Sequence, residues 1–258
     1  MNTSSTKETV KEKSYSLESE NGDSLEIRRI QRNLYEFCKF KIDEANQSFR
    51  SVAGGKLFNY CKSNSIVLST DDQDYDRPII KLLEQSNFQL KYTRVLYGKR
   101  LQGHQLLYED IFGYKSVKEI GLDEFLKVFE NVLEDSDKLL GHGVYFNALV
   151  ELVEHEGGKY DPNQWKLVML NGQAIGAILP QVYSGKDDWG GIMHIGLVAE
   201  ARNKSYGRIL HSKCLELLKD QRTKRYIGST DINNKAMIRV FKISGCKEMF
   251  KRFIYEAN

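Results

Sequence analysis

The stretch GIMHIGLV-AEARNKSY-GRILHSKCLELLK covers residues 191–219 and decides the fold. Its first eight residues are mostly apolar and predict a strand, whereas the next eight are polar and predict a loop. From residue 207 to 219 apolar residues recur at the spacing of one helical face. A loop that leads into a helix offers unpaired backbone N–H groups and the positive end of the helix dipole. The stretch is therefore suited to hold a pyrophosphate.

Further strands and helices are expected on both sides of this stretch. Residues 166–170 and 173–179 are rich in β-forming residues and are joined by Asn171-Gly172, a strong signal for a two-residue hairpin. The other elements that we expect in this half are helices at 122–133 and 145–152, a strand at 226–230, a helix at 234–244 and a strand at 248–255 that closes the sheet.

Several residues of this half stand at the spacing of a known motif. The run RNKSYG at 202–207 resembles the Arg/Gln-x-x-Gly-x-Gly/Ala acyl-CoA loop of the GNAT N-acetyltransferase superfamily. Asn234, Met237 and the pair Gly245-Cys246 resemble the later Asn-x-x-Met/Ala helix of that family, which is closed by Gly-Phe. The order hairpin, strand, loop and helix, strand, helix, strand is also that of the family.

This resemblance implies a fold, a cosubstrate and a set of binding residues. The fold is α/β (α+β), with a mixed, mostly antiparallel sheet that is flanked by helices and splays at the strand ending in Val198. The cosubstrate is acetyl-CoA, whose carbonyl is polarised by a backbone N–H near Val198. The residues that we expect to contact acetyl-CoA are Leu197, Val198, Arg202, Asn203, Lys204, Ser205, Tyr206, Gly207, Arg208, Asn234, Met237 and Phe241.

Three residues depart from the family pattern. Ser205 stands where the family usually has its first loop glycine, and a serine is disfavoured if that position needs a positive φ. Cys246 replaces the usual Phe and should alter packing only. Phe241 stands where many members have a Tyr that protonates the departing CoA thiolate; Tyr206, Tyr226 or a water would then serve, or the thiolate leaves without a positioned acid.

His194 is the candidate catalytic base. It precedes Val198 by four residues on the same strand, so the two side chains share a face. A histidine at this offset is similar to the proton acceptor of arylalkylamine acetyltransferases, and the usual imidazole pKa suits the task. A histidine satisfied in the core is the alternative. His211 is expected to face outward from its helix, and His142 and His155 have weaker claims.

The acceptor amine is expected near an acidic loop. Asp187 and Asp188 would attract an ammonium group while Trp189 packs on its apolar part, and Tyr145 is also assigned to the acceptor site. A solvated turn is the alternative interpretation of this loop.

A self-similarity suggests duplication within the chain. Residues 66–97 align with 226–255, so that Ser69-Thr70-Asp71 falls on Ser229-Thr230-Asp231. Chance similarity between two strand–helix–strand units is the alternative. We expect a flexible tail at 1–24, a degenerate partial GNAT-like domain at 25–104 and a GNAT acetyltransferase domain at 105–258. Within the partial domain the sequence predicts a helix at 34–42, a strand at 66–68, a helix from Pro78 and a strand pair within 88–101.

Composition narrows the possible partners and locations. The 258 residues include 38 Lys plus Arg against 35 Asp plus Glu, and the resulting charge of +3 is spread along the chain, which argues against nucleic acid as a partner. No apolar run is long enough to cross a bilayer, and the first 24 residues are too polar for a signal peptide, so we expect no membrane contact and a cytoplasmic protein. The four cysteines lack metal-ligand spacing, so we expect no metal and mostly buried thiols. A monomer or a homodimer is expected.

The sequence-based hypothesis is an N-acetyltransferase that transfers an acetyl group from acetyl-CoA to a primary amine of a small molecule or peptide by direct attack. One alternative is a non-catalytic acyl-CoA-binding regulatory or scaffold protein, which the substitutions at Ser205 and Phe241 would suit. Another is transfer of a longer acyl or an aminoacyl group.

Overall fold

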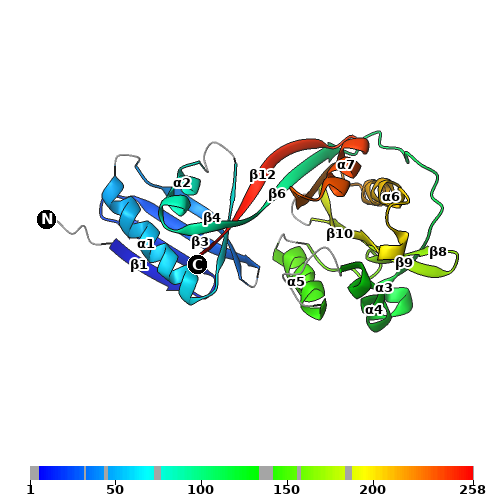
Figure 1. The fold of residues 1–258 in the computed structure, drawn as a ribbon, viewed down its shortest axis with the longest axis horizontal. Coiled ribbons are helices and arrows are strands. Elements are labelled where there is room, and N and C mark those ends of the chain that lie inside the picture. Colours follow the sequence, from blue (N-terminus) through cyan, green and yellow to red (C-terminus); the bar gives the residue numbers. More distant parts are fainter. Residues whose placement is uncertain are drawn as a thin grey trace. The chain divides into compact units, whose positions relative to one another are not determined.

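The computed structural model describes residues 6–31, 33–43, 46–72, 77–133, 142–155, 158–183 and 188–257 (Figure 1). The chain divides into two compact units. Unit 1 comprises Met1–Val95 and Phe250–Asn258, and unit 2 comprises Leu96–Met249. In the described part of the chain no helix is both long enough and apolar enough to cross a membrane.

Unit 2 has a mixed sheet with helices on both faces. Its elements are, in chain order, β7 (Gly113–Ser116), α3 (Val117–Ile120), α4 (Leu122–Leu133), α5 (His142–His155), β8 (Lys166–Leu170), β9 (Gln173–Val182), β10 (Trp189–Leu197), the 3₁₀ turn η2 (Ala199–Ala201), α6 (Tyr206–Asp220), β11 (Arg225–Asp231) and α7 (Lys235–Ile243). Strand β6 (Phe88–Arg100) enters this sheet, whose order is β6-β11-β10-β9-β8-β7. The β10–β11 pair is parallel, and β7 to β10 pair antiparallel, as the sequence predicts.

The local signals of this half are confirmed in the structure. The hairpin between β8 and β9 turns at Asn171 and Gly172, whose φ angles of 50° and 80° are the positive values that a type I′ turn needs. Helices α4 and α5 pack an aromatic cluster on one face of the sheet, around Phe125, Phe129 and Phe146. On the other face, Leu210 and Cys214 of α6 pack on Val168 and Ile178. The sheet is therefore buried on both faces.

Unit 1 has the same order of elements around its own parallel strand pair. Its elements are β1 (Thr6–Lys11), β2 (Ser14–Ser19), β3 (Ser24–Gln31), β4 (Leu34–Lys41), α1 (Gln47–Ser63), β5 (Val67–Asp71) and α2 (Arg77–Gln85), followed by β6 and, from the end of the chain, β12 (Lys247–Ala257). The sheet order is β1-β2-β3-β4-β5-β12-β6. Strands β4 and β5 are parallel, as β10 and β11 are, and the aligned residues Asp71 and Asp231 each end their strand.

Strand β12 joins unit 1 although it follows α7 of unit 2 in the chain. It pairs antiparallel with β5, with Arg252 opposite Asp71 and Glu256 opposite Val67. Tyr255 is 3% exposed and belongs to the core that α1 and α2 form with the strands of unit 1. The predicted closing strand thus exists, but from Phe250 onward it completes the sheet of unit 1, whereas the sequence-based division placed it in the C-terminal domain.

The structure differs from the sequence prediction at the N-terminus. Residues 6–11 and 14–19 are strands of the sheet and not part of a flexible tail. The few apolar residues of these strands lie in the core of unit 1. Tyr15 and Leu17 are almost fully buried, and the Tyr15 ring stacks on the Tyr60 ring at 4.0 Å between centroids. An edge strand gains most of its pairing from backbone groups, which composition does not reveal. Residues 1–5 lie outside the described part.

A second difference concerns residues 34–42, where a helix was expected. Residues 34–41 form β4, which pairs with β3 on one side and β5 on the other. Cys38, which the helical stripe would bury, is exposed, whereas Tyr35 is buried. The run also suits a strand because it is rich in aromatic residues, and pairing on both sides favours the strand over the helix.

The expected strand pair in 88–101 is one long strand, β6. Three of the four cysteines are buried as small apolar residues, as predicted.

Candidate functional site

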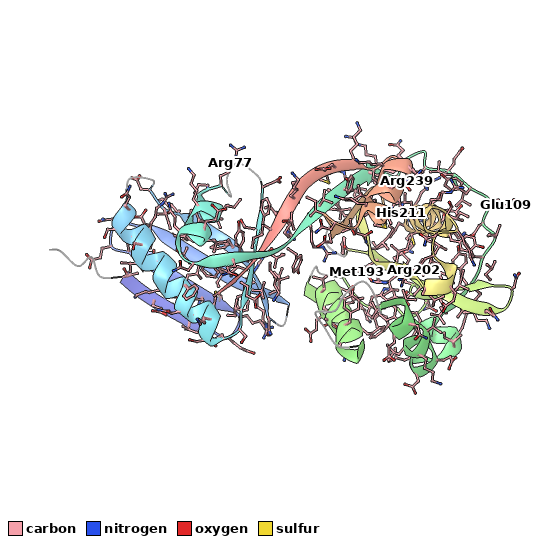
Figure 2. The ribbon with its side chains drawn as sticks, viewed as in Figure 1. Arg77, Glu109, Met193, Arg202, His211 and Arg239 are labelled. Atoms are coloured by element: carbon pink, nitrogen blue, oxygen red, sulfur yellow. The ribbon has the colours of Figure 1, made fainter. Side chains whose placement is uncertain are left out.

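The two parallel strands of unit 2 pair over part of their length only. Trp189, Gly190 and Gly191 of β10 pair with residues 225–227 of β11, whereas β10 continues to Leu197 paired with β9. The register of β10 against β9 shifts between Ile192 and His194, which marks a bulge at Met193 (Figure 2). Within the described strands the sheet therefore splays beyond Gly191, as predicted. At this end of β10 the Val198 N–H donates to the Ile175 carbonyl oxygen at 3.0 Å, and the Leu197 carbonyl oxygen accepts from Arg202 at 2.9 Å. An extended ligand would therefore pair with the other backbone groups of β10 that face the splay.

The loop after β10 has an unusual backbone. Asn203 and Ser205 have φ angles of 61° and 64°, and Ser205 is the N-cap of α6 in the left-handed region. Its side chain makes no capping hydrogen bond. Left-handed residues in a loop are typical of backbone nests, in which successive N–H groups form an anion-binding concavity. The position that the resembled family usually fills with glycine has a positive φ here, and it is occupied by serine.

The charges around this helix end favour an anion. Arg202, Lys204 and Arg208 lie within or next to the loop, Glu200 is its one acidic residue, and the first turn of α6 contains none. Cations at the positive end of a helix dipole are unfavourable unless a negative group is present. The pyrophosphate of acetyl-CoA fits this arrangement.

The cations differ in what they contact. The Arg202 Nε atom donates to the Leu197 carbonyl oxygen at 2.9 Å, so this side chain ties the loop to the end of β10 (Figure 2). The Arg208 guanidinium lies over the Tyr108 ring, 4.6 Å from its centroid, and its buried Nε has no hydrogen-bond partner among the described residues. Lys204 is exposed. Arg208 and Lys204 are therefore the cations available to phosphate oxygens.

Helix α7 contributes Asn234 and Met237 to this side of the unit. The Asn234 side-chain oxygen accepts from the Met237 backbone N–H at 3.0 Å, so Asn234 is the N-cap of α7. The side chain of Met237 is half-buried and that of Asn234 is exposed. Asn234 was assigned to the cofactor from the sequence, and in the structure it also has a structural role as the N-cap of α7.

Phe241, which the sequence-based assignment gives to the cofactor, is a core residue in the structure. The ring is 1% exposed and stacks on Tyr97 at 4.8 Å between centroids, with His211 and Tyr226 also against it. The Phe241 side chain on α7 faces the core because it packs against Tyr97 of β6, a strand from the first half of the chain.

His211 and Tyr226 also belong to this core. His211 is fully buried, not outward-facing as predicted, and its ring nitrogens contact the Ser244 hydroxyl at 2.8 Å and the Tyr226 hydroxyl at 3.2 Å (Figure 2). Burial lowers the His211 pKa to about 3 and raises the Tyr226 pKa well above its usual value. Tyr226 is one of the groups considered as a proton donor to the CoA thiolate, and it is enclosed in the core. The remaining candidates for this donor are Tyr206, which is half-buried at the start of α6, and a water molecule.

His194 points to the opposite face of the sheet, toward α4 and α5. Its ring lies edge-on to Phe129 at 5.2 Å between centroids, and its Nδ1 atom is 3.4 Å from the Tyr145 hydroxyl. The Nε2 atom is buried without a hydrogen-bond partner among the described residues. The structure thus brings together two residues predicted from the sequence, His194 and Tyr145, on the side of the splay away from α6.

Burial determines the protonation of His194. It lowers the pKa of the imidazole to about 4, because the apolar surroundings disfavour the charged form. The ring is therefore neutral at pH 7 and has a free lone pair, but it is a weaker base than an exposed imidazole.

The acidic loop lies far from this pair. Asp188 and Trp189 adjoin the start of β10, and at about 3.3 Å per residue Trp189 is roughly 16 Å along the strand from His194. The Asp188 carboxylate pairs with Lys224 at 2.9 Å, and Trp189 stacks under the Arg225 guanidinium. Both residues thus have local partners at the start of β10. Asp187 lies outside the described residues, and the side chains of His142 and His155 do as well.

Phe129 and Val132 are site residues that sequence reasoning did not identify. Phe129 packs on His194, and Val132 lies so close that a side chain at Gly196 would meet it. Both fall on the apolar stripe of α4, which the sequence predicts as core. No local signal distinguishes a core position that contacts His194 from any other.

Ser205→Gly is expected to stabilise the protein. A left-handed conformation of a residue other than glycine costs on the order of 1 kcal/mol, and no capping bond is lost because Ser205 makes none. Part of the gain is offset because glycine makes the unfolded chain more flexible. Thermal unfolding should show a midpoint a few degrees higher. Asn203→Gly is the matched control and should gain less, since asparagine tolerates this region. A lower midpoint for Ser205→Gly would contradict the assigned strain.

Comparisons with known proteins give the same fold. Residues 129–245 match the model of the Acetyltransferase (GNAT) family. No curated protein sequence matches the chain. Among solved structures, a GCN5-related N-acetyltransferase from Sphaerobacter thermophilus has a TM-score of 0.66 at 13% identity, covering 97% of this chain and 82% of that one.

Two further structures are similar along nearly the whole chain. A tandem GNAT protein from the clavulanic acid biosynthesis pathway has a TM-score of 0.61 at 11% identity, over 95% of this chain and 83% of that one. A GCN5-related N-acetyltransferase from Kribbella flavida has a TM-score of 0.60 at 8% identity, over 98% and 89%. The chain therefore has the fold of these GNAT structures along nearly its whole length, including that of a tandem GNAT protein, and its residues 129–245 match the GNAT acetyltransferase family model.

Proposed function

We propose that this protein is an N-acetyltransferase that moves the acetyl group of acetyl-CoA to a primary amine of a small molecule or peptide by direct attack. The observation that carries the proposal is the splay of β10 and β11 directly before a basic, left-handed loop at the N-terminus of α6. Acyl transfer follows from the family, whereas the donor and the acceptor are our inference.

In this proposal, acetyl-CoA binds on one side of the sheet at the splay and the acceptor amine binds on the other. On the α6 side, the loop N–H groups with Lys204 and Arg208 would hold the diphosphate, and the backbone groups of β10 that face the splay would align the arm and polarise the acyl carbonyl. On the α4–α5 side, the amine would approach past Tyr145 and His194. Holding both reactants in attack geometry can supply about 7 to 11 kcal/mol, so positioning is the main catalytic device.

The reaction itself needs one proton removed and one returned. The neutral amine attacks the thioester carbonyl, the C–S bond breaks as the C–N bond forms, and the amine proton leaves for a base. His194 has the lone pair to accept it, directly or through a water. The CoA thiolate takes a proton from Tyr206 or water, or leaves as the thiolate.

The proposal is tested by following free thiol during incubation with acetyl-CoA and a panel of polyamines, amino acids and peptides. Thiol release that requires an amine, and an acetylated amine by mass spectrometry, are expected. Binding of CoA without release from any amine would favour the non-catalytic alternative. Release that becomes faster with longer acyl donors would replace acetyl by a larger group.

His194→Ala is expected to lower turnover about 10²-fold or more, the usual contribution of a positioned base. With a pKa of about 4 the base form is present throughout the range from pH 5 to 8. The wild-type kcat/KM should therefore show no inflection near pH 6.5 and should rise with deprotonation of the amine. His194→Gln is the control that keeps a polar group beside Tyr145 but accepts no proton. Equal turnover in the wild type and both variants would remove His194 from the mechanism.

A further inference from the structure

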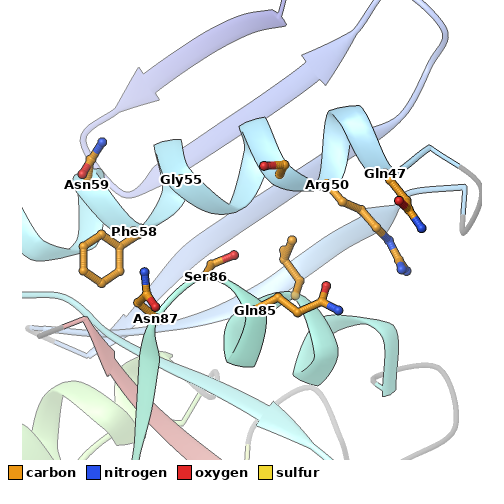
Figure 3. A pocket seen from close by; sticks show the side chains of 10 residues that line it. Gln47, Arg50, Gly55, Phe58, Asn59, Gln85, Ser86 and Asn87 are labelled. Atoms are coloured by element: carbon orange, nitrogen blue, oxygen red, sulfur yellow. The ribbon is translucent and has the colours of Figure 1, made fainter.

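Unit 1 contains a pocket between α1 and α2, far in sequence from the acetyltransferase loop (Figure 3). Its volume is about 520 Å³, within the roughly 300 to 1,000 Å³ of small-molecule sites. One wall is a single face of α1, because residues 47, 51, 55, 58 and 59 recur at helical spacing. The other wall is the last turn of α2 and residues 86–87 that follow it. All lining residues belong to unit 1, so the pocket is complete within that unit.

Arg50 gives this pocket an unusual charge. The Nε and Nη2 atoms of its guanidinium are buried and have no hydrogen-bond partner among the described residues. Figure 3 shows the Arg50 side chain extending from α1 toward α2, next to that of Gln47. A charged donor buried without a partner is among the costliest groups in a protein interior. Such a group is retained where an anion pairs with it.

The two atoms lie on the same edge of the guanidinium, which defines the partner. This edge offers two parallel N–H groups that match the two oxygens of a carboxylate. Arg252 uses the same edge in the same unit: its Nε lies 2.6 Å and its Nη2 3.0 Å from the two oxygens of Asp71. Arg50 thus offers the contact that Arg252 makes with Asp71.

The rest of the pocket favours a singly charged ligand with polar groups. Arg50 is its one charged lining residue, and six neutral polar side chains share the walls: Gln47, Ser51, Asn59, Gln85, Ser86 and Asn87. A phosphate monoester, with a charge near −2, is usually held by several cations or by a helix N-terminus. One guanidinium edge surrounded by amides and hydroxyls suits a carboxylate that also has hydroxyl or amide groups. Phe58 and Leu82 supply an apolar surface for its carbon atoms.

The two adjacent glycines of α1, Gly54 and Gly55, give further evidence for a ligand in this pocket. Glycine within a helix is destabilising relative to alanine. Gly54 has a packing reason, since a Cβ there would lie 1.9 Å from the Ser86 Oγ. Gly55 has none, because a Cβ would meet nothing within 4 Å, and yet it lines the pocket. The missing side chain at Gly55 keeps space open in front of the wall that Arg50 shares.

We propose that the pocket between α1 and α2 is a binding site for a small carboxylate, whose two oxygens pair with Nε and Nη2 of Arg50 while its polar groups bond to the amides and hydroxyls around it. This site is separate from the acyl-transfer site and does not depend on it.

The test uses the full chain and three probes, L-lactate, L-glutamine and N-acetylglycine, each compared with its methyl ester. Calorimetric titration and the thermal midpoint are measured for the wild type, Arg50→Gln, Arg50→Lys and Gly55→Leu. We expect at least one acid to bind and its ester not to bind. Arg50→Gln should weaken binding at least tenfold, and Arg50→Lys should weaken it as well because lysine lacks the fork. Gly55→Leu should block binding without lowering the midpoint.

Controls separate this site from others. Arg28→Gln removes a guanidinium of unit 1 that pairs with Glu36 on the surface, and it should leave binding unchanged. Gly207→Glu, in the acetyl-CoA loop of unit 2, should also leave it unchanged, so that failure of the proposed acyl transfer does not affect the result. No acid binding at about 10 mM would overturn the proposal, since weaker affinity would be non-specific. Binding that persists in Arg50→Gln, or binding of inorganic phosphate or CoA at Arg50 in place of the acids, would overturn it too.

Discussion

A chain that ends at Met249 is expected to lose the fold of unit 1, although only nine residues at the far end of the sequence are removed. Those residues include Ile254 and Tyr255, which are 1% and 3% exposed, and five register pairs with β5. Burying each large apolar side chain stabilises by about 1.5 to 3 kcal/mol. The truncation also removes the bidentate Arg252–Asp71 pair, in which Asp71 is only 9% exposed in the intact chain. The sum approaches the 5 to 15 kcal/mol that typically stabilises a whole domain.

Hydrogen exchange read out by mass spectrometry is the measurement, because it reports each unit separately. Peptides from β2, β3 and α1 should exchange rapidly in the truncated chain and slowly in the full one. Tyr255→Ala is a milder variant and should weaken protection of the same peptides by a few kcal/mol, as core truncations do. Removal of Asn258 alone is the control. Protection of unit 1 that survives the loss of 250–258 would show that the pairing of β12 with β5 adds little.

Gly207→Glu is expected to abolish binding of CoA. Gly207 is the second residue of α6, where an added carboxylate would face the same positive helix end that attracts the diphosphate and would compete with it. Gly207→Ala is the matched control. A Cβ at this position would have its nearest neighbour, Val240 Cγ2, at 3.7 Å, which is an ordinary contact. Alanine should therefore fold at least as well and bind CoA within a few-fold of the wild type.

Equilibrium titration with CoA separates the two variants. The expected loss for Gly207→Glu is at least 100-fold, the change when a charge-assisted phosphate contact is replaced by repulsion. A circular dichroism spectrum and a melting curve show that the variant is folded. Retained affinity in a folded Gly207→Glu protein would mean that the diphosphate does not sit on the loop after β10.

Local chemistry made the second half of the chain predictable from sequence. Residues 122–133, read as an apolar stripe at helical spacing, are α4 with the same bounds, and Asn171-Gly172 is the hairpin turn that its residues demand. The basic loop before α6 was identifiable because the residues of its motif are neighbours in sequence. These features depend on contacts within a few residues, which a single sequence displays.

Long-range pairing accounts for what was not predictable. The sequence near β12 does not indicate that its pairing partner is β5. The sequence of residues 6–19 does not indicate that these residues form strands of a sheet. His211 was expected at the surface because its helical face was judged from α6 alone, whereas α7 and β11 cover that face with Ser244 and Tyr226. Asp188 and Trp189 were assigned to the acceptor from their charge and apolar surface, and the structure places them at the end of β10 opposite to Leu197, a placement that residue type alone does not reveal.

The long strand β12 also has a consequence for how the protein is made. A ribosome releases residues 67–71 well before residues 252–256, their partners. Until those partners emerge, the nascent chain presents β5 with open backbone groups along one edge, the kind of surface on which other nascent chains pair and aggregate. Chaperone dependence during translation should accordingly be greater than the small size of either half would suggest.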